Sequence, residues 1–275
     1  MVRAIRAGTP RTTLLRQIHL LIVAAMLLLA SFGAAAQRVE GVRARAEALH
    51  DGGNRVIATG RRQALLDEIA SARPGLVGLQ HDVNDVPALS RLSIQLRDRF
   101  PELNVLFANA GISRSEDMAS EAWTADDAEA IVQTNILGVT RMAAAFLPLI
   151  KGKPHATFLA TSSALAFVPR ADFPTYCASK AFLHSWLQSM RHQLRRVPVE
   201  VLELSPPYVQ TTLTGAQQAH DPRAMPLADY VAEVLQILDA GNTPRGEVLL
   251  ERDFARRWSE RDGRYEATFA AVNPA

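Results

Sequence analysis

Cysteine is almost absent from the sequence, which contains only Cys177 among its 275 residues. A disulfide within the chain is therefore excluded. The sequence also lacks the clusters of cysteine and histidine that hold a structural zinc ion, so we predict no metal site. Cys177 itself is the kind of small apolar residue that packs inside a domain.

A marked excess of charge of one sign is lacking as well. The 30 basic and 28 acidic residues leave a formal net charge of +2, and the arginines are scattered along the chain. Proteins that bind nucleic acids gather basic residues on one face, often beside stacking aromatic residues. We therefore expect no nucleic-acid partner and predict a small-molecule substrate instead.

No linker rich in Pro, Gly and Ser divides the chain, which indicates a single domain. From His50 onward, short apolar runs alternate with longer amphipathic stretches. The expected strands are Arg55–Thr59, Leu76–Gln80, Val105–Ala108, Thr157–Thr161, Val199–Glu203 and Val248–Leu250. The expected helices cover residues 62–72, 86–99, 124–148, 175–196 and 227–240. This alternation predicts an α/β fold with a doubly wound, Rossmann-like parallel sheet, which binds its ligands beyond the carboxyl ends of the strands.

Three residues near such strand ends could carry acid–base chemistry. Tyr176 and Lys180 are four residues apart in an expected helix, so their side chains lie on one face, one turn from each other. A free tyrosine has a pKa of about 10, and we expect the nearby ammonium to lower it. Ser163 follows an expected strand, and its hydroxyl could hold a substrate carbonyl beside the phenol.

The segment Thr161–Pro169, followed by Thr175–Ala181, resembles the active-site segment of classical short-chain dehydrogenases/reductases. The resemblance implies that Tyr176 transfers the proton of the reaction. It implies that Lys180 lowers the pKa of this tyrosine and binds the ribose of a nicotinamide cofactor, and that Ser163 orients the substrate oxygen.

Further matches extend the resemblance in both directions. Asn135 corresponds to the fourth member of the family's catalytic set, which supports a water relay to the lysine. The cofactor contacts that the resemblance implies fall on Asp82, Val83, Asn109, Ala110, Gly111, Tyr176, Lys180, Val209 and Thr211. By resemblance, the protein is also expected to form a homo-oligomer through the helices that carry the asparagine and the tyrosine.

The choice of cofactor depends on the residues after the second strand of the fold, here Arg61 and Arg62. In dinucleotide-binding folds an acidic residue at this position binds the ribose hydroxyls of NAD, whereas arginine accommodates the 2′-phosphate of NADP. We therefore predict NADP as the cofactor, with NAD as the alternative, and count both arginines among the cofactor-binding residues.

The resemblance covers residues 44–275, and residues 1–43 form a divergent N-terminal segment. The family carries Thr-Gly-x-x-x-Gly-x-Gly between the first strand and the first helix, where glycines let the backbone approach the pyrophosphate. The corresponding window, residues 35–42, contains only Gly41, which is out of register. The resemblance to the family begins abruptly near residue 44, and a frame change in the coding sequence could also produce this.

The N-terminal segment admits three interpretations. Four arginines before the apolar run Leu20–Ala30, and three alanines after it, resemble a signal peptide. Residues 18–36 could instead associate with a membrane as an anchor. The same run, as Leu20–Ala24 or Leu27–Phe32, could supply the central strand of the sheet. We favour this strand, because its removal would leave unpaired backbone groups on both neighbours.

These observations predict a cytoplasmic, NADP-dependent oxidoreductase that interconverts a carbonyl and a secondary alcohol. Two alternatives stay open. One is a catalytically silent homologue with impaired dinucleotide binding that acts as a binding or assembly partner. The other is a reductase anchored to a membrane through residues 18–36.

Overall fold

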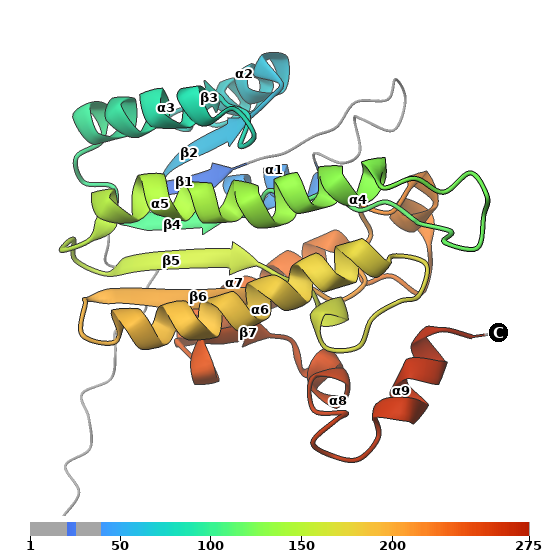
Figure 1. The fold of residues 1–275 in the computed structure, drawn as a ribbon. Helices are drawn as coiled ribbons and strands as arrows, with labels where there is room; N and C mark the ends of the chain where they lie inside the picture. The colour runs from blue at the N-terminus through green and yellow to red at the C-terminus, as the bar shows by residue number, and fades with distance from the viewer. Residues whose placement is uncertain (1–20, 26–39, 275) are drawn as a thin grey trace, which may run out of the picture.

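The computed structural model describes residues 21–25 and 40–274 (Figure 1). Seven strands form one sheet in the order β3-β2-β1-β4-β5-β6-β7, and every neighbouring pair is parallel. The strands are β1 (Leu21–Ala25), β2 (Arg55–Gly60), β3 (Val77–Gln80), β4 (Val105–Ala108), β5 (Ala156–Thr161), β6 (Val199–Ser205) and β7 (Glu247–Leu249). The predicted doubly wound α/β sheet is confirmed.

Helices cover both faces of the sheet. The α-helices are α1 (Glu40–Asp51), α2 (Gln63–Ala72), α3 (Val86–Arg99), α4 (Asp126–Ile131), α5 (Val139–Ile150), α6 (Pro174–Leu194), α7 (Leu227–Ala240), α8 (Phe254–Arg257) and α9 (Tyr265–Val272). The other helical turns are η2 (Val132–Gly138), η3 (Ala164–Ala166), η4 (Ala216–His220), η5 (Pro244–Gly246) and η6 (Glu251–Asp253). Apolar residues of α3, α5 and α6 pack on one face, and those of α1, α2 and α7 on the other.

The two apolar layers provide most of the stability of the sheet. Phe146 of α5 and Phe158 of β5 are almost completely buried in one layer, and Leu66 of α2 and Tyr230 of α7 are buried in the other. Burying a large apolar side chain contributes about 1.5–3 kcal/mol. Strands that are covered on both faces are apolar throughout, which is why short continuous apolar runs predicted them correctly.

Strand β1 (Leu21–Ala25) lies between β2 and β4, at the centre of the sheet. It overlaps one of the two predicted positions for a central strand, Leu20–Ala24. The other position, Leu27–Phe32, lies outside the described residues, as do most of residues 18–36. The boundary of the divergent segment at residue 43 stays a prediction.

The helix expected over residues 124–148 consists of α4, η2 and α5 in direct succession. The middle piece, η2, is a π-helix, whose wider turn often marks a functional position. Within the described ranges, the stretch Asp126–Ile150 is the one helix that is long and apolar enough to cross a membrane. It packs against β4, β5 and α3, so its place is that of a core helix of the sheet.

The carboxyl ends of β4, β5 and β6 lie at one edge of the sheet (Figure 1). The predicted catalytic residues lie in the segments that follow β4 and β5. The last elements, α8 and α9, have no counterpart among the expected helices. Asn273 after α9 accepts a hydrogen bond from the backbone N–H of Ala171 (2.6 Å) and donates one to the carbonyl of Pro169 (3.0 Å). The C-terminal end thus packs against the loop between β5 and α6.

Candidate active site

Tyr176 and Lys180 lie in the first two turns of α6. The N–H groups at the start of a helix lack partners within the helix, and the N-cap residue Phe173 offers no side-chain hydrogen bond. Glu116 accepts hydrogen bonds from the N–H (3.0 Å) and hydroxyl (2.9 Å) of Thr175, and its charge suits the helix dipole. This buried carboxylate therefore fixes the start of the helix beside the tyrosine.

The Lys180 side chain is almost fully buried. Its Nζ donates a hydrogen bond to the carbonyl oxygen of Thr161 (2.8 Å) and lies 5.7 Å from the centre of the Tyr176 ring. Burial disfavours the ammonium and lowers the pKa of Lys180 to about 8. A Cβ atom at Gly111 would lie 3.3 Å from this Nζ, so a glycine keeps the space around the ammonium open.

The pKa of Tyr176 is raised above its ordinary value. Burial, which disfavours the phenolate, is the main cause, and hydrogen bonding with Ser163 acts in the opposite direction. The expectation that the ammonium of Lys180 lowers this pKa was therefore wrong. The reason is geometric, because the ammonium faces the tyrosine ring and donates to the carbonyl of Thr161. The phenol is held protonated, the form in which it can donate a proton.

Ser163 is the N-cap of the short helix η3 after β5. Its Oγ accepts a hydrogen bond from the backbone N–H of Leu165 (3.1 Å), which holds the side chain in one orientation. The residue is buried, and it lines the same cavity as Tyr176. Its hydrogen bond with Tyr176 places the hydroxyl beside the phenol, where both groups could contact a substrate oxygen.

Asn135 lies in the π-helix η2 and is completely buried. Its amide accepts from the N–H of Ile112 (2.8 Å) and donates to the carbonyl of the same residue (3.0 Å) and to the hydroxyl of Ser179 (2.9 Å). The Ser179 hydroxyl donates to the carbonyl of Tyr176 (2.7 Å). Asn135 thus ties the loop after β4 to the helical turn that carries the tyrosine.

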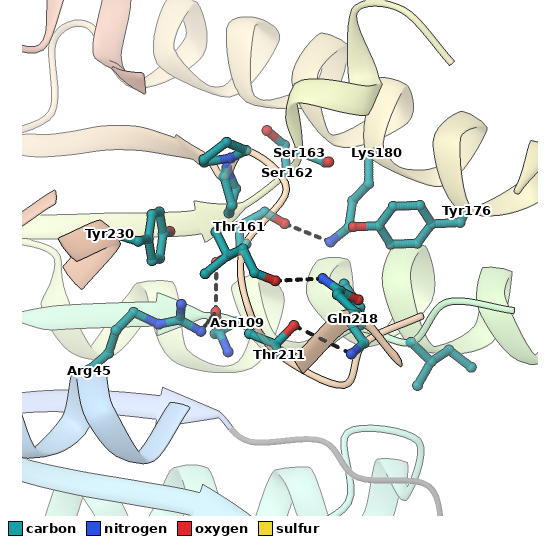
Figure 2. A pocket seen from close by; sticks show the side chains of 16 residues that line it. Arg45, Asn109, Thr161, Ser162, Ser163, Tyr176, Lys180, Thr211, Gln218 and Tyr230 are labelled. Atoms are coloured by element: carbon teal, nitrogen blue, oxygen red, sulfur yellow. Dashed lines mark hydrogen bonds between the residues drawn. The ribbon is translucent and has the colours of Figure 1, made fainter. Parts of the chain in front are cut away.

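One cavity at the carboxyl edge of the sheet unites many of the predicted site residues (Figure 2). Its lining includes the predicted residues Asn109, Gly111, Ser163, Tyr176, Lys180, Val209 and Thr211. The predicted residues Arg61, Arg62, Asp82, Val83, Ala110 and Asn135 do not line it. Within the part of the chain that the structure describes, no cluster of side chains is suited to hold a metal ion.

The predicted adenosine end lies beyond the cavity, after β2 and β3. Arg61 Nη1 is 3.8 Å from Asp82 Oδ2, and its Nε and Nη2 are buried without a hydrogen-bond partner. Burial lowers the pKa of Arg61 and the pKa of Arg62. The positive charge of Arg61 lowers the pKa of Arg62 further. Unused guanidinium donors of this kind suit a phosphate ligand.

A family model described as short chain dehydrogenase matches residues 42–222, more than half of the chain. The chain belongs to the short-chain dehydrogenase family. The match begins inside α1, close to where the resemblance was predicted to begin. The residues that would hold the glycine motif of this family therefore lie before the matched range.

Curated relatives in the short-chain dehydrogenase family carry oxidoreductase names. The chain is 34% identical over 225 residues to the uncharacterized oxidoreductase DltE of Bacillus subtilis, covering 80% of this chain and 87% of that one. It is 30% identical over 161 residues to the NADP-dependent 3-hydroxy acid dehydrogenase YdfG of Escherichia coli, covering 58% of this chain and 64% of that one. The family to which the chain belongs is thus one whose members carry the names of oxidoreductases.

Solved structures of short-chain dehydrogenases share the fold. The enzyme from Streptomyces avermitilis superposes with a TM-score of 0.73 at 21% identity, over 92% of this chain and 97% of that one. A Burkholderia cenocepacia enzyme in complex with NADP gives a TM-score of 0.70 at 22% identity, over 94% of this chain and 98% of that one. At such identities the likeness establishes the fold alone.

The described residues fit a dinucleotide at two of its ends. Gly111 leaves space beside the Lys180 ammonium, and Arg61 holds unused buried donors. The middle of the site is different, because residues 26–39, between β1 and α1, contain a single glycine, Gly33. Gly41 lies in the first turn of α1 and is not part of a loop.

Sequence reasoning missed a residue that organises the loop between β6 and α7. Gln218 is buried in η4 and donates to the carbonyl of Val209 (2.7 Å). Its amide oxygen accepts from both the N–H (2.9 Å) and the hydroxyl (2.7 Å) of Thr214. It also lines the cavity. No local motif marks such a residue, since its partners depend on how the loop folds back.

A second missed residue is Glu203 of β6, whose side chain is completely buried. It accepts a hydrogen bond from the Ser162 hydroxyl (2.6 Å) and lies 2.8 Å from His184 Nδ1 and 3.5 Å from Arg191 Nη2. This carboxylate links β6 to α6 and to Ser162, the residue that precedes Ser163. An apolar strand pattern gives no sign of it.

Proposed function

We propose that this chain is an NADP-dependent oxidoreductase that interconverts a carbonyl and a secondary alcohol. The observation that carries the proposal is the convergence of Ser163, Tyr176 and Lys180 on one cavity, beside Asn109 and Thr211. These residues come from distant parts of the sequence, and the fold brings their polar atoms to the edge where a parallel sheet binds its ligands.

Each catalytic residue has a distinct task. When bound, the nicotinamide cofactor supplies or accepts the hydride. Ser163 holds the substrate oxygen, and Tyr176, protonated because of its raised pKa, donates its proton to that oxygen in the direction of reduction. Lys180, whose ammonium lies in the cavity 5.7 Å from the centre of the Tyr176 ring, would bind the ribose of the cofactor. Asn135 keeps the tyrosine in place through Ser179.

The preference for NADP is argued from the arginines after β2. The 2′-phosphate distinguishes NADP from NAD, and guanidinium groups bind phosphates through paired N–H donors. Arg61 has such donors unused, and Arg62 lies close enough for the two charges to repel each other. An anionic ligand between them would relieve this repulsion.

The test is a titration of the purified full-length protein with NADPH and with NADH, followed by quenching of its three tryptophans. Micromolar binding with NADPH preferred supports the proposal, and a screen of carbonyl substrates then follows NADPH consumption. A folded sample that binds neither cofactor would refute it.

The second candidate function is a silent homologue that acts as a binding or assembly partner. It is favoured by one observation, the single glycine in residues 26–39. The same titration separates the two functions. A folded protein that binds neither cofactor but captures a partner chain would favour the silent homologue.

A homo-oligomer is part of the proposal. Apolar side chains are exposed on the helices predicted to form the interface, with Val132 39% and Leu137 36% exposed on η2 and Phe182 38% exposed on α6. Pairing these surfaces between two copies would bury them. Light scattering of the wild type and of Phe182→Glu tests this, since the charge is expected to shift the mass towards a monomer.

We also propose that the protein is cytoplasmic. The central strand β1 uses residues 21–25, which belong to the stretch that an anchor through residues 18–36 would need. A segment that pairs with β2 and β4 is not available to span a bilayer. Fractionation of cells that express the full chain tests this, and recovery in the membrane fraction would favour the anchored alternative.

A further inference from the structure

Arg45 of α1 is a cation in the cavity for which the family resemblance assigns no role. Its side chain reaches from α1 to the carboxyl ends of the strands and meets Asn109, on the opposite side of the cavity from Tyr176 (Figure 2). Arg45 Nη2 donates a hydrogen bond to Asn109 Oδ1 (2.9 Å). Its guanidinium carbon lies 5.9 Å from the ring centres of Phe107 and Tyr230.

None of these partners carries a negative charge. Among the described residues, no Asp or Glu forms an ion pair with Arg45, and none lines the cavity. The second cation in the lining is Lys180. Arg45 is partly buried, and placing a guanidinium partly away from water without a counter-ion costs free energy. Burial accordingly lowers the pKa of Arg45, and the nearby Tyr230 hydroxyl acts in the opposite direction.

Arg43, two residues earlier in the same helix, shows the contrast. Its guanidinium pairs with Glu47 (2.8 Å) and with Glu68, and these hydrogen bonds raise its pKa. Glu47 of α1 and Glu68 of α2 thus neutralise the arginine outside the cavity, whereas no carboxylate whose side chain the structure describes pairs with the arginine inside it. The missing negative charge at Arg45 is one that a ligand could supply.

We propose that Arg45 binds the pyrophosphate bridge of the dinucleotide. The proposal rests on the proposed function and explains how a chain with one glycine between β1 and α1 can hold such a cofactor. In doubly wound folds the pyrophosphate lies at the N-terminus of the first helix, next to the carboxyl ends of the central strands. The side chain of Arg45 extends from α1 towards these strand ends (Figure 2). A planar guanidinium offers paired N–H donors and a full charge in place of several backbone N–H groups.

The first measurement is thermal unfolding of the wild type, Arg45→Leu and Arg43→Leu without ligand. Arg45→Leu is expected to raise the melting temperature, since it removes a partly buried cation that has no carboxylate partner among the described side chains. Arg43→Leu is the matched control on the same helix and is expected to leave the melting temperature unchanged or slightly lower. Arg45→Gln, which keeps an N–H donor for Asn109, replaces Arg45→Leu should that variant fail to fold.

The second measurement is binding of NADPH by the same proteins, together with the shift in melting temperature caused by inorganic pyrophosphate. Arg45→Leu is expected to weaken NADPH binding at least tenfold and to abolish the pyrophosphate shift, while Arg43→Leu changes neither by more than twofold. Opposite effects on stability and on binding are the signature of a residue kept for a ligand and not for the fold.

The outcomes separate this proposal from the proposed function. If the wild type binds no NADPH but shows a pyrophosphate shift that depends on Arg45, the anion site stands and the oxidoreductase proposal fails. If NADPH binds equally well or better to Arg45→Leu, the arginine blocks the cavity or serves the fold, and the present proposal is overturned. If neither probe binds to any of the proteins, both proposals fail.

Discussion

The catalytic half and the phosphate half of this molecule treat their polar groups differently. In the catalytic half, around β4, β5 and α6, Asn135 and Lys180 bind partners within the protein. In the phosphate half, around α1 and β2, Arg61 keeps buried donors without hydrogen bonds, and Arg45 has no carboxylate partner among the described residues. The first half is organised by the chain itself, whereas the second keeps donors that, in our proposal, an anion completes.

This difference predicts how each half responds to substitution. Changes in the catalytic half should reduce turnover or stability, because the groups there depend on one another. Changes in the phosphate half should reduce ligand affinity and leave the unliganded protein intact or more stable. The following experiments sharpen that comparison or break it.

The largest effect is expected from Tyr176→Phe. Loss of the phenol removes the proton donor, and general acid catalysis contributes about 10²–10⁴-fold to rate. We expect kcat to fall by that factor with NADPH affinity within about twofold of the wild type, because the ring stays in place. Steady-state kinetics and cofactor titration measure the two quantities. A variant that keeps more than about a tenth of the activity would show that another group donates the proton.

Glu203→Ala tests whether the catalytic half is held by its own buried charges. The substitution leaves His184 and Arg191 without their carboxylate, and breaking a buried pair costs about 3–5 kcal/mol. The control is Glu200→Ala, an exposed position on the same strand, for which we expect a change within about 0.5 kcal/mol. Denaturant unfolding measures both, and equal small losses would mean that the buried network contributes little.

The contrast between the halves also explains what the sequence could predict. The strands and most helices follow from apolar spacing, and the catalytic residues follow from one short stretch, because Ser163, Tyr176 and Lys180 share a loop and a helix. Glu116 and Gln218 were missed, since their partners are brought together only by tertiary folding. Glu116 lies 59 residues before Thr175, from whose N–H it accepts a hydrogen bond, and so distant a pair leaves no local sequence pattern.

Pairing information is likewise mostly absent from the sequence in the phosphate half. Arg43 and Arg45 are both arginines in one helical turn, and of their contacts only the pair of Arg43 with Glu47, four residues on, could be read from spacing. The pairing of Arg43 with Glu68 on α2 and the hydrogen bond of Arg45 to Asn109 after β4 arise only from the tertiary fold. The pKa of Tyr176 was misjudged for a related reason, because helical spacing gives the distance between two side chains but not the direction in which the ammonium points.

Lys180→Met is expected to remove a pH dependence of stability. Burial lowers the pKa of Lys180 from 10.5 to about 8, so between these values the unfolded chain binds a proton that the folded protein has released. The free energy of unfolding of the wild type therefore rises with pH in this window, by about 2 kcal/mol between about pH 7 and pH 9.5 relative to the methionine variant. Denaturant unfolding at the two pH values measures this difference, and parallel curves would contradict it.

Arg61→Ala is expected to have the smallest effect, a loss of about tenfold in NADPH affinity with NADH affinity unchanged. The two cofactors differ only in the 2′-phosphate, so the ratio of their dissociation constants isolates this one contact from every other. Arg97→Ala, an exposed arginine paired with Asp98 on α3, is the control for loss of a positive charge. Stability should change by less than about 1 kcal/mol, because the pair of Arg61 with Asp82 is long and partly exposed. An equal loss for both cofactors would place Arg61 near a part that they share, and the phosphate half would then have to select NADP by Arg62 or by residues before α1.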